Sequence, residues 1–246
     1  MDPFVIQIAQ LATQVQPMFS STREYCRCYL TERSPDFFVA VTVQDLVHEQ
    51  EMAELEALEE GLRIRKFTEP FLERAAIQRK IARELIDRNT ILLHGSTIGV
   101  DGAAYLFTAP CRTGKSTHTR LWRKVFGNRA VMVNDDRAFL RITHDGVLAY
   151  GSPWSGKHGL DTNISLPLKG ICFLHRGAEN RIHRAASPDC VSELRHQCFL
   201  PEDARGQEIA FALVERLAQM VPLWQMECTK DPAAARMSHQ AMSGVR

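Results

Sequence analysis

The sequence lacks an excess of charge of either sign, because 30 lysines and arginines balance 29 aspartates and glutamates to a formal net charge of +1. Such a chain is a poor partner for duplex DNA or an anionic membrane, so we expect no nucleic acid and no membrane partner. No stretch approaches the roughly 18 apolar residues that a membrane-spanning helix needs. The first residues, MDPFVIQIAQL, show no basic leader and no small-residue cleavage site, which predicts no signal peptide and a cytoplasmic location.

Paired cysteines are also missing, since the 7 cysteines are odd in number and scattered. Cys26 and Cys28 alternate within YCRCYL, which we predict to be a strand, so their side chains would point to opposite faces. Without a second pair of ligands they make a poor zinc site. We expect free thiols in a reducing cytoplasm.

Internal repeats, low-complexity tracts and linkers rich in proline or glycine are absent, which favours one continuous α/β (α+β) domain. Residues 1–89 predict a small N-terminal α+β subregion packed on a core formed by residues 90–246. Its expected strands are FVIQIAQL, YCRCYL and FFVAVTV, and its expected helices are TVQDLVHEQEMAELEALEEGLR and TEPFLERAAIQRKIARELIDR. The acidic run EQEMAELEALEE is either an interaction surface or the solvated face of a helix.

From residue 90 the pattern favours strands in succession around one helix. Asp101 and Gly102 predict a hairpin turn between TILLHGSTIGV and AAYLFTA. A helix, KSTHTRLWRKVFG, and the strands AVMVN, AFLRIT, VLAYGSPW and PLKGICFLHRG follow, and the C-terminal third reads as mainly helical with one strand, PLWQMEC. A doubly wound fold would alternate strands and helices, so we predict mixed β-sheets around a single helix instead.

The stretch APCRTGKS matches the phosphate-loop pattern Gly-x-x-x-x-Gly-Lys-Ser/Thr except that Ala109 replaces the first glycine. A Gly-Lys-Ser tripeptide means little alone, but here it follows an apolar strand and opens an amphipathic helix. Gly114 would let the backbone approach a phosphate, Lys115 would meet the β- and γ-phosphates, and Ser116 would bind Mg²⁺. The predicted nucleotide-binding residues are Ala109, Pro110, Cys111, Arg112, Thr113, Gly114, Lys115, Ser116 and Thr117.

Asp135 and Asp136 directly follow the apolar strand VMVN, where two adjacent carboxylates are costly unless a cation or partner compensates them. One could hold Mg²⁺ while the other accepts a proton from an attacking hydroxyl. The alternative is a turn in which both acids are solvated. His94 ends the apolar run TILLH, and the following hairpin could return it beside the phosphate loop, although a histidine there could also be structural.

The stretch LLHGSTIGVDGAAYLFTAPCRTGKST with VMVNDD resembles the catalytic core of the HPr kinase/phosphorylase family and the wider phosphoenolpyruvate-carboxykinase-like group. The resemblance is clear over residues 90–136 and looser to about residue 176. It implies a P-loop core of mixed sheets around one P-loop helix, and a nucleotide-dependent phosphotransferase that uses ATP and Mg²⁺.

The resemblance also implies roles for single residues. Lys115 and Ser116 would take the phosphate and Mg²⁺ roles, and Asp136 would be a second Mg²⁺ ligand. Asp135 would be the catalytic acid/base, and His94 a further catalytic polar group near the transferred phosphate. Ala109 departs from the family's first glycine.

The segment GSPWSGKHGLDTN is rich in glycine and predicts a mobile loop after a strand, where sites are often assembled. Lys157 is a candidate catalytic residue that could close over a phosphate, and His158 and Arg176 are weaker candidates for contact with the substrate. The alternative for this segment is a surface turn anchored by Trp154.

Together these features predict an ATP-dependent kinase that phosphorylates a serine-like hydroxyl of a peptide, protein or small molecule, such as a biosynthetic peptide. Two alternatives stay open: a catalytically inactive nucleotide-binding regulator, and a carboxykinase acting on a keto acid. The sequence fixes neither the acceptor nor the phosphate donor nor the oligomeric state, and a homo-oligomer is compatible with it.

Overall fold

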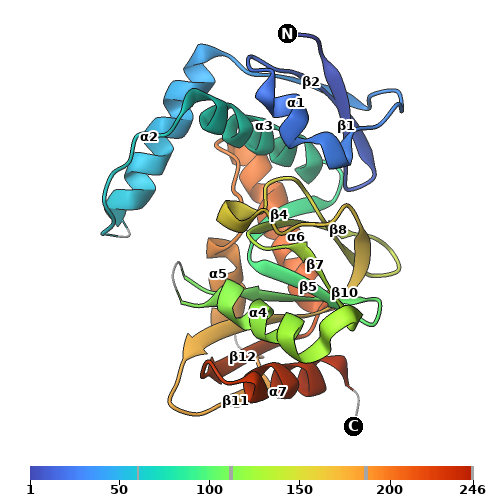
Figure 1. The fold of residues 1–246 in the computed structure, drawn as a ribbon, viewed down its shortest axis with the longest axis vertical. Helices are drawn as coiled ribbons and strands as arrows, with labels where there is room; N and C mark the ends of the chain where they lie inside the picture. Colours follow the sequence, from blue (N-terminus) through green and yellow to red (C-terminus); the bar gives the residue numbers. More distant parts are fainter. Residues whose placement is uncertain (60, 111–112, 186–187, 245–246) are drawn as a thin grey trace. The chain divides into compact units, whose positions relative to one another are not determined.

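The computed structural model describes residues 1–59, 61–110, 113–185 and 188–244. Contacts between Cα atoms divide the chain into two compact units, Met1–Glu84 and Leu85–Arg246, which we call the N-terminal and the C-terminal unit. The division predicted between residues 89 and 90 stays a prediction. Both units combine helices and strands, so the protein is a mixed α/β protein (Figure 1). Within the described ranges, no helix is long and apolar enough to cross a membrane.

The N-terminal unit contains a three-stranded sheet in the order β1-β2-β3, with β2 antiparallel to β1 and parallel to β3. Its elements are β1 (Phe4–Ile8), β2 (Leu11–Gln16), α1 (Ser21–Tyr25), the 3-10 helix η1 (Arg27–Tyr29), β3 (Phe37–Ala40), α2 (Val43–Glu59) and α3 (Glu69–Ile86). FVIQIAQL is therefore not one strand. Ala9 and Gln10 adopt φ angles of 48° and 68°, which turn the chain back into β2 although neither residue is a usual turn former.

The prediction of a strand at YCRCYL is wrong, because this stretch covers the end of α1 and the 3-10 helix η1. A buried carboxylate explains the coiling. Glu73 accepts hydrogen bonds from the backbone N–H groups of Met18 and Phe19 and from the hydroxyl of Thr22, and this fixes the turn from which α1 starts.

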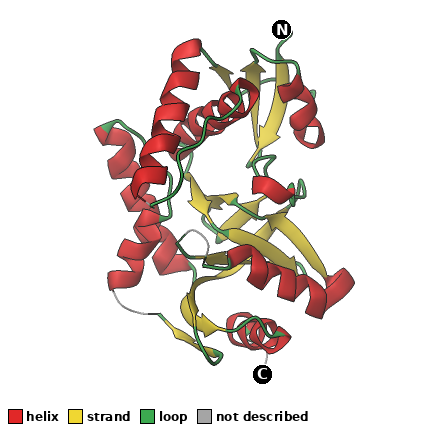
Figure 2. Ribbon diagram, turned by 60° about the vertical axis from the view of Figure 1, so that its left-hand side comes forward, coloured by secondary structure: helices red, strands yellow, loops and turns green. Residues whose placement is uncertain are grey.

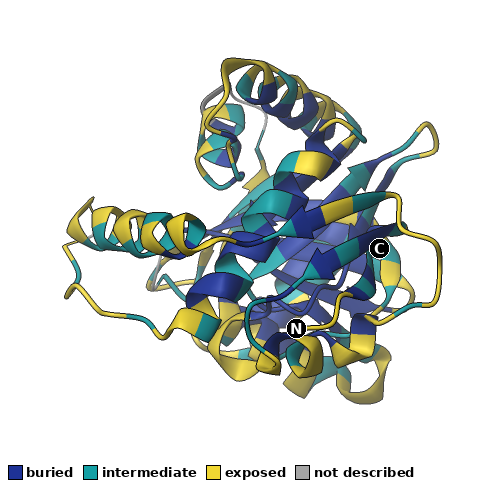
Figure 3. Ribbon diagram, turned by 90° about the horizontal axis from the view of Figure 1, so that it is seen from above, coloured by how far each residue is buried: buried dark blue, intermediate teal, exposed yellow. Residues whose placement is uncertain are grey.

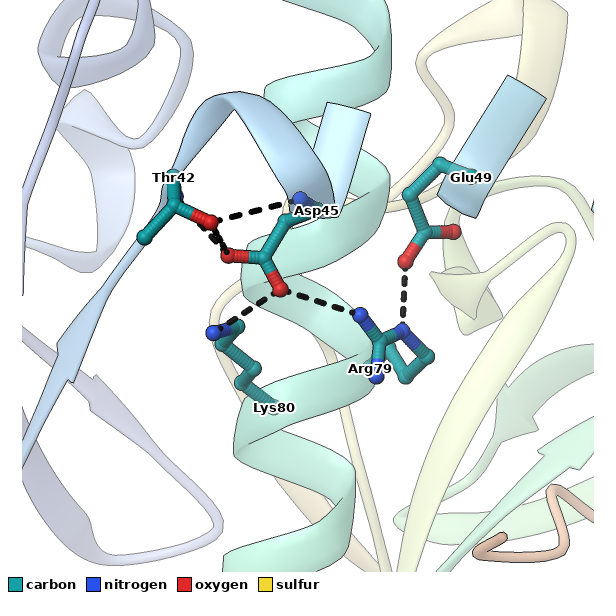
Figure 4. Close-up of polar contacts among 5 residues, drawn as sticks. All are labelled: Thr42, Asp45, Glu49, Arg79 and Lys80. Atoms are coloured by element: carbon teal, nitrogen blue, oxygen red, sulfur yellow. Dashed lines mark hydrogen bonds and ion pairs between the residues drawn. The ribbon is translucent and has the colours of Figure 1, made fainter. Parts of the chain in front are cut away.

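The two long helices of this unit, α2 and α3, confirm the sequence prediction, and ion pairs join them (Figure 4). Arg79 of α3 donates to Asp45 at 3.3 Å and also pairs with Glu49, while Lys80 lies 2.9 Å from Asp45. Of these two acids only Glu49 belongs to the acidic run, whose Glu51, Glu56 and Glu59 are exposed. The exposed face of α2 also carries apolar side chains. Its exposed apolar side chains are Val43, Val47, Met52, Leu55 and Leu58.

The C-terminal unit follows the predicted succession of strands around α4, with two departures: TILLHGSTIGV forms two strands, β4 and β5, and the strand β11 was not predicted. Its strands are β4 (Thr90–His94), β5 (Ser96–Val100), β6 (Ala103–Thr108), β7 (Ala130–Asn134), β8 (Arg137–Ile142), β9 (Val147–Tyr150), β10 (Ser165–Arg176), β11 (Arg181–Arg184) and β12 (Leu223–Cys228). Its helices are α4 (Lys115–Phe126), α5 (Pro188–His196), α6 (Ala204–Met220) and α7 (Pro232–Ser243), with the 3-10 helices η2 (Gly127–Arg129) and η3 (Gly156–His158).

Within the described ranges these strands form one mixed sheet, as predicted, in the order β4-β8-β9-β10-β6-β5-β7, with β12 beside β10 and β11 beside β12. The long strand β10 joins its two halves. The start of β10 pairs antiparallel with β9, and its later residues pair parallel with β6 and β12. The predicted hairpin is confirmed, since Asp101 and Gly102 have φ angles of 52° and 79° and connect β5 to β6.

Helices cover both faces of this sheet (Figure 2). Alternating side chains of β6 show the two layers: Ala104 and Leu106 pack in the core with α5 and α6, whereas Tyr105 and Phe107 pack in the core with α4 and α7. The central strands are buried while the outer faces of the helices are exposed (Figure 3). The sheet is thus a rigid layer on which loops at the strand ends are held in place.

Two connections cross between the halves of the sheet at the same place. β4 leads into β5 through Gly95, and β7 leads into β8 through Asp135 and Asp136. The N–H of Gly95 donates to the carbonyl oxygen of Asp136 at 2.8 Å. A Cβ atom at Gly95 would lie 2.7 Å from a methyl group of Leu106, so the chain has no room for a side chain there. The hydroxyl of Thr108, at the end of β6, donates to the carbonyl of His94 at 2.8 Å.

Candidate functional site

The loop between β6 and α4 leads directly into the helix N-terminus. Gly114 has φ = 130°, a region that favours glycine, and its carbonyl accepts the N–H of His118 in the first turn of α4. Lys115 is 9% exposed, and its Nζ atom donates to the carbonyl of Ala109 across the loop at 2.9 Å. This places a cation and a helix N-terminus together, an arrangement that favours anions.

The remaining loop residues that were predicted to bind nucleotide have different environments. The methyl group of Ala109 is buried in the core with α4 and α7, and Ala109 is not among the described residues with positive φ, so alanine fits at the strand end without strain. Pro110 and Ser116 are exposed, and Thr113 and Thr117 are half-buried. Cys111 and Arg112 lie outside the described residues.

The acid turn, residues 134–137, is held by the fully buried side chain of Asn134. Its Oδ1 accepts the backbone N–H groups of Asp136 at 2.9 Å and Arg137 at 2.7 Å. Asp135 is 8% exposed, and its N–H donates to the carbonyl of Leu160 at 3.1 Å. The Asp136 side chain is 40% exposed. The two neighbouring acids thus differ in access, with one enclosed and one open.

A chain of hydroxyl groups links α4 to the enclosed acid. The hydroxyl of Ser96 donates to Asp135 Oδ1 at 2.6 Å and lies 2.8 Å from the hydroxyl of Thr119 on α4. Ser96 and Thr119 are fully buried. Because the Ser96 proton goes to Asp135, Ser96 is the acceptor in its contact with Thr119, whose hydroxyl also lies 3.4 Å from the carbonyls of Lys115 and Ser116. The first turns of α4 and the acid turn are in this way connected by direct hydrogen bonds.

The charges of Lys115 and of the acid turn influence the pKa values of His94 and Asp136. Burial, with the charges of Lys115 and Arg137, lowers the pKa of His94 to about 3, so the imidazole is neutral near pH 7. Burial raises the pKa of Asp136, assisted by the charge of Asp135 and opposed by those of Arg137 and Lys115. His94 Nε2 lies 3.7 Å from Asp136 Oδ1. A further positive charge near Asp136, such as a metal ion, would therefore favour its ionised form.

The glycine-rich segment, residues 151–161, begins beside the acid turn. The amide nitrogen of Asn134 lies 3.0 Å from the carbonyl oxygen of Ser152 and 3.2 Å from that of Trp154. A Cβ atom at Gly156 would lie 3.1 Å from the Cβ of Asp136, so the segment passes close to this acid. From Gly156 to His158 the segment forms the exposed 3-10 helix η3.

The catalytic candidate Lys157 and the weaker candidates His158 and Arg176 lie at the edges of this arrangement. Lys157 and His158 are exposed on η3. Arg176, at the end of β10, donates from Nε to the carbonyl of Thr113 at 3.4 Å, which places it at the loop before α4. The structure thus gathers His94, Lys115 and the acid pair, and it leaves Lys157 and His158 at the solvent side.

The protein residues of this site could hold a divalent cation only together with further ligands that complete its coordination shell. The described residues contain no group of three or more His, Cys, Asp or Glu side chains that could hold a metal ion. The candidate ligands are the exposed hydroxyl of Ser116 and the carboxylate of Asp136. Mg²⁺ commonly keeps several waters and binds through one or two carboxylates plus substrate phosphates, so this sparse set suits Mg²⁺ with a nucleotide.

Sequence reasoning missed four residues of this site. They are Ser96, Thr119, Asn134 and Arg137. Asn134 had a weak signal, since a polar residue that ends a buried strand needs partners for its amide. Ser96 and Thr119 had none, because their role depends on two elements that meet only in the folded chain.

Comparison with known proteins gives distant structural likenesses only. No family model and no curated protein sequence matches the chain. Among solved structures, an HPr(Ser) kinase/phosphatase from Coxiella burnetii aligns with a TM-score of 0.37 and 11% sequence identity over 62% of this chain and 93% of that chain. A likeness of this size does not establish the family of the chain.

Proposed function

We propose that this protein is an ATP-dependent kinase that transfers the γ-phosphoryl group to a hydroxyl of a peptide, a protein or a small molecule. The observation that carries the proposal is the chain of hydrogen bonds from Thr119 through Ser96 to Asp135, which joins the helix that starts at Lys115 to the acid turn. The charge of Lys115 also opposes protonation of His94 and Asp136. A cationic helix N-terminus beside paired carboxylates is what phosphoryl transfer requires.

In this proposal the loop before α4 binds the phosphates. Gly114 leaves space for close approach, since, apart from its chain neighbours, no described residue has an atom within 4 Å of the place where its Cβ would be. The backbone N–H groups of the first turn of α4 and the ammonium of Lys115 attract the β- and γ-phosphate oxygens. Arg176, held at the carbonyl of Thr113, adds positive charge beside the same loop.

In this proposal the two acids, Asp135 and Asp136, have different tasks. Asp136, the open acid, and Ser116 hold Mg²⁺, which when bound neutralises charge on the phosphates. Asp135 accepts the proton of the acceptor hydroxyl, while the O–H of Ser96 keeps its carboxylate oriented. His94 is a neutral polar neighbour of the transferred group, and Lys157 approaches it from the exposed η3.

The first test replaces Lys115 with alanine and measures binding of Mg-ATP by calorimetry. We expect affinity to fall by about 100-fold or more, because the buried cation at the helix N-terminus is lost. Lys124→Ala, at an exposed position on the same helix, is the matched control and should bind like the wild type. Unchanged binding by Lys115→Ala would refute the assignment of the loop.

A second test separates binding from transfer. Asp135→Asn preserves the shape and the contact with Ser96 but removes the base, so we expect nucleotide binding to persist while transfer falls by about 10²- to 10⁴-fold. Asp145→Asn, at an exposed turn, serves as the control. Equal loss of binding and transfer would count against the base role.

The acceptor is found by incubating the protein with Mg-ATP and candidate peptides and small hydroxyl compounds, and by following the gain of one phosphate by mass spectrometry. Nucleotide binding without transfer to any acceptor would favour a nucleotide-binding regulator instead of a kinase.

A further inference from the structure

The glycine-rich segment has fixed ends and an exposed tip. Near its start, Ser155 donates its hydroxyl to Asp161 Oδ1 at 2.5 Å, which closes the segment on itself. Near its end, the carbonyl of Leu160 accepts the N–H of Asp135. Between these points the tip is exposed, and Gly156 and Gly159 have φ angles of 71° and 58°. The position of the tip, which carries Lys157, therefore depends on how firmly the two ends of the segment are held.

Asn134 is the side chain that joins these fixed ends to the acid turn. It is fully buried and uses both halves of its amide. Its oxygen accepts from the N–H groups of Asp136 and Arg137, and its nitrogen donates toward the carbonyls of Ser152 and Trp154. No other common side chain of this size accepts and donates in this way, because aspartate only accepts and leucine does neither.

Contact between the segment and the acid turn is close enough for this joint to matter. The position of a Cβ at Gly156 is 3.1 Å from the Cβ of Asp136, so a small displacement of the segment would change the surroundings of this acid. Two further contacts run through Ser152, whose hydroxyl donates to the carbonyl of Arg137 at 3.3 Å and lies 3.1 Å from the Asn134 nitrogen.

We propose that Asn134 is a positioning residue whose amide fixes the glycine-rich segment to the acid turn, and so sets the place of Lys157 relative to Asp136. Its donors hold the segment and its acceptor holds the turn, so the two functions can be separated by substitution. That this placement serves phosphoryl transfer rests on the proposed function, whereas the fixing of the segment does not.

The test is backbone hydrogen exchange in Asn134→Asp and Asn134→Ala. In Asn134→Asp the carboxylate still accepts from Asp136 and Arg137 but cannot donate to the segment. We expect the amides of Ser155 and Gly159 to exchange about tenfold faster or more beyond the general increase across β6 and β10 that the loss of global stability causes, while those of Asp136 and Arg137 show only that general increase.

In Asn134→Ala both sets of amides should exchange faster. This variant adds no charge beside the acid pair, so it also separates the loss of the donors from the effect of a third carboxylate. Asn180→Asp is the matched control, because the contacts of the Asn180 side chain with described residues run through its oxygen, which accepts from the N–H and the hydroxyl of Thr229. It should leave the exchange of all these amides unchanged.

Two results would overturn the proposal. One is unchanged exchange in the segment of either Asn134 variant. The other is an equal increase across β6 and β10, which would show that Asn134 only contributes to general stability. Amide exchange needs no enzymatic activity, so it decides the fixing role even if the proposed function fails.

Activity gives a second readout. If the protein is a kinase, Asn134→Asp should lower kcat by about 10- to 100-fold with little change in KM for the nucleotide, because displaced groups cost rate more than binding. A wild-type protein that transfers no phosphate would refute the proposed function alone. Active variants with a changed segment would show that the placement of Lys157 is not needed for transfer.

Discussion

Two buried polar side chains each hold a turn, one in each unit of the molecule, and they do so differently. Glu73 in the N-terminal unit accepts from the N–H groups of Met18 and Phe19 and from the hydroxyl of Thr22. Asn134 in the C-terminal unit accepts from two N–H groups and also donates to two carbonyls. A carboxylate can close one turn, whereas an amide can join a turn to a second segment.

The difference shows that the hydrogen-bonding groups of a buried polar side chain, and not its burial alone, determine which backbone segments it can hold together. Both side chains are fully buried, and both satisfy backbone groups that would otherwise be costly. Only Asn134 lies where two segments, the acid turn and the glycine-rich segment, are held next to each other. The predictions below replace buried polar side chains by residues that lack some of their hydrogen-bonding groups. They run from the largest expected loss of stability to the smallest.

The largest effect is expected for Glu73→Ala. The variant leaves the buried hydroxyl of Thr22 and the half-buried N–H groups of Met18 and Phe19 without their acceptor, so we expect a loss of about 3–5 kcal/mol in the free energy of unfolding. Urea unfolding followed by circular dichroism measures it. Glu73→Gln is the control and should lose less than about 1 kcal/mol, because the Gln oxygen still accepts from the backbone and its nitrogen can donate to the Thr22 hydroxyl. A large loss in Glu73→Gln would mean that the charge itself is required.

For Asn134→Asp we expect an intermediate loss of about 2–3 kcal/mol in the free energy of unfolding, because the carbonyls of Ser152 and Trp154 lose their donor and a third carboxylate joins the acid turn. The same substitution at Asn180, where only the oxygen is used, should cost less than about 0.5 kcal/mol. Similar losses at the two positions would show that donation by Asn134 contributes nothing.

The smallest effect concerns a third buried polar side chain, His118 on α4. Its Nε2 accepts from the indole N–H of Trp122 at 3.2 Å, and burial lowers its pKa to about 4. The unfolded chain therefore takes up a proton near pH 6.5 that the folded chain does not, so stability is complete above this pH and falls as the pH drops toward 4.

Between pH 7 and 5.5 His118 should account for a loss of about 1 kcal/mol, and unfolding in urea at the two pH values measures it. His94, whose pKa is lowered to about 3, acts in the same direction. The raised pKa of Asp136 acts in the opposite direction, in the pH range between its usual pKa and its raised value in the folded chain. His118→Leu should reduce the pH dependence by the share of one histidine. An unchanged dependence would mean that His118 is protonated in the folded protein.

Elements with local signals could be predicted from the sequence. The hairpin at Asp101 and Gly102 and the start of α4 after Gly114 depend on residue types that suit positive φ angles. The hairpin at Ala9 and Gln10 could not be predicted, because neither residue type is typical of turns. The turn there is determined by the pairing and packing of β1 and β2. The helical turns at residues 25–29 were hidden for a similar reason, since the Glu73 that fixes them is far away in the sequence.

The candidate site divides along the same line. Lys115 and the acid pair follow from local sequence, because a helix start and a strand end are both visible in a linear pattern. The roles of Ser96 and Asn134 depend on partners in other elements, Thr119 and Trp154 among them, and no periodicity reports such pairs. Sequence therefore gives the charged groups of the site more readily than the neutral groups that hold them.

The strand β10 has a consequence for how the C-terminal unit unfolds. It pairs with β9 in one half of the sheet and with β6 and β12 in the other, and its side chains alternate between both cores. Neither half can detach from β10 without exposing apolar surface of the other. Partial opening is therefore costly, and this unit is expected to lose its structure in a single cooperative transition without a half-folded intermediate.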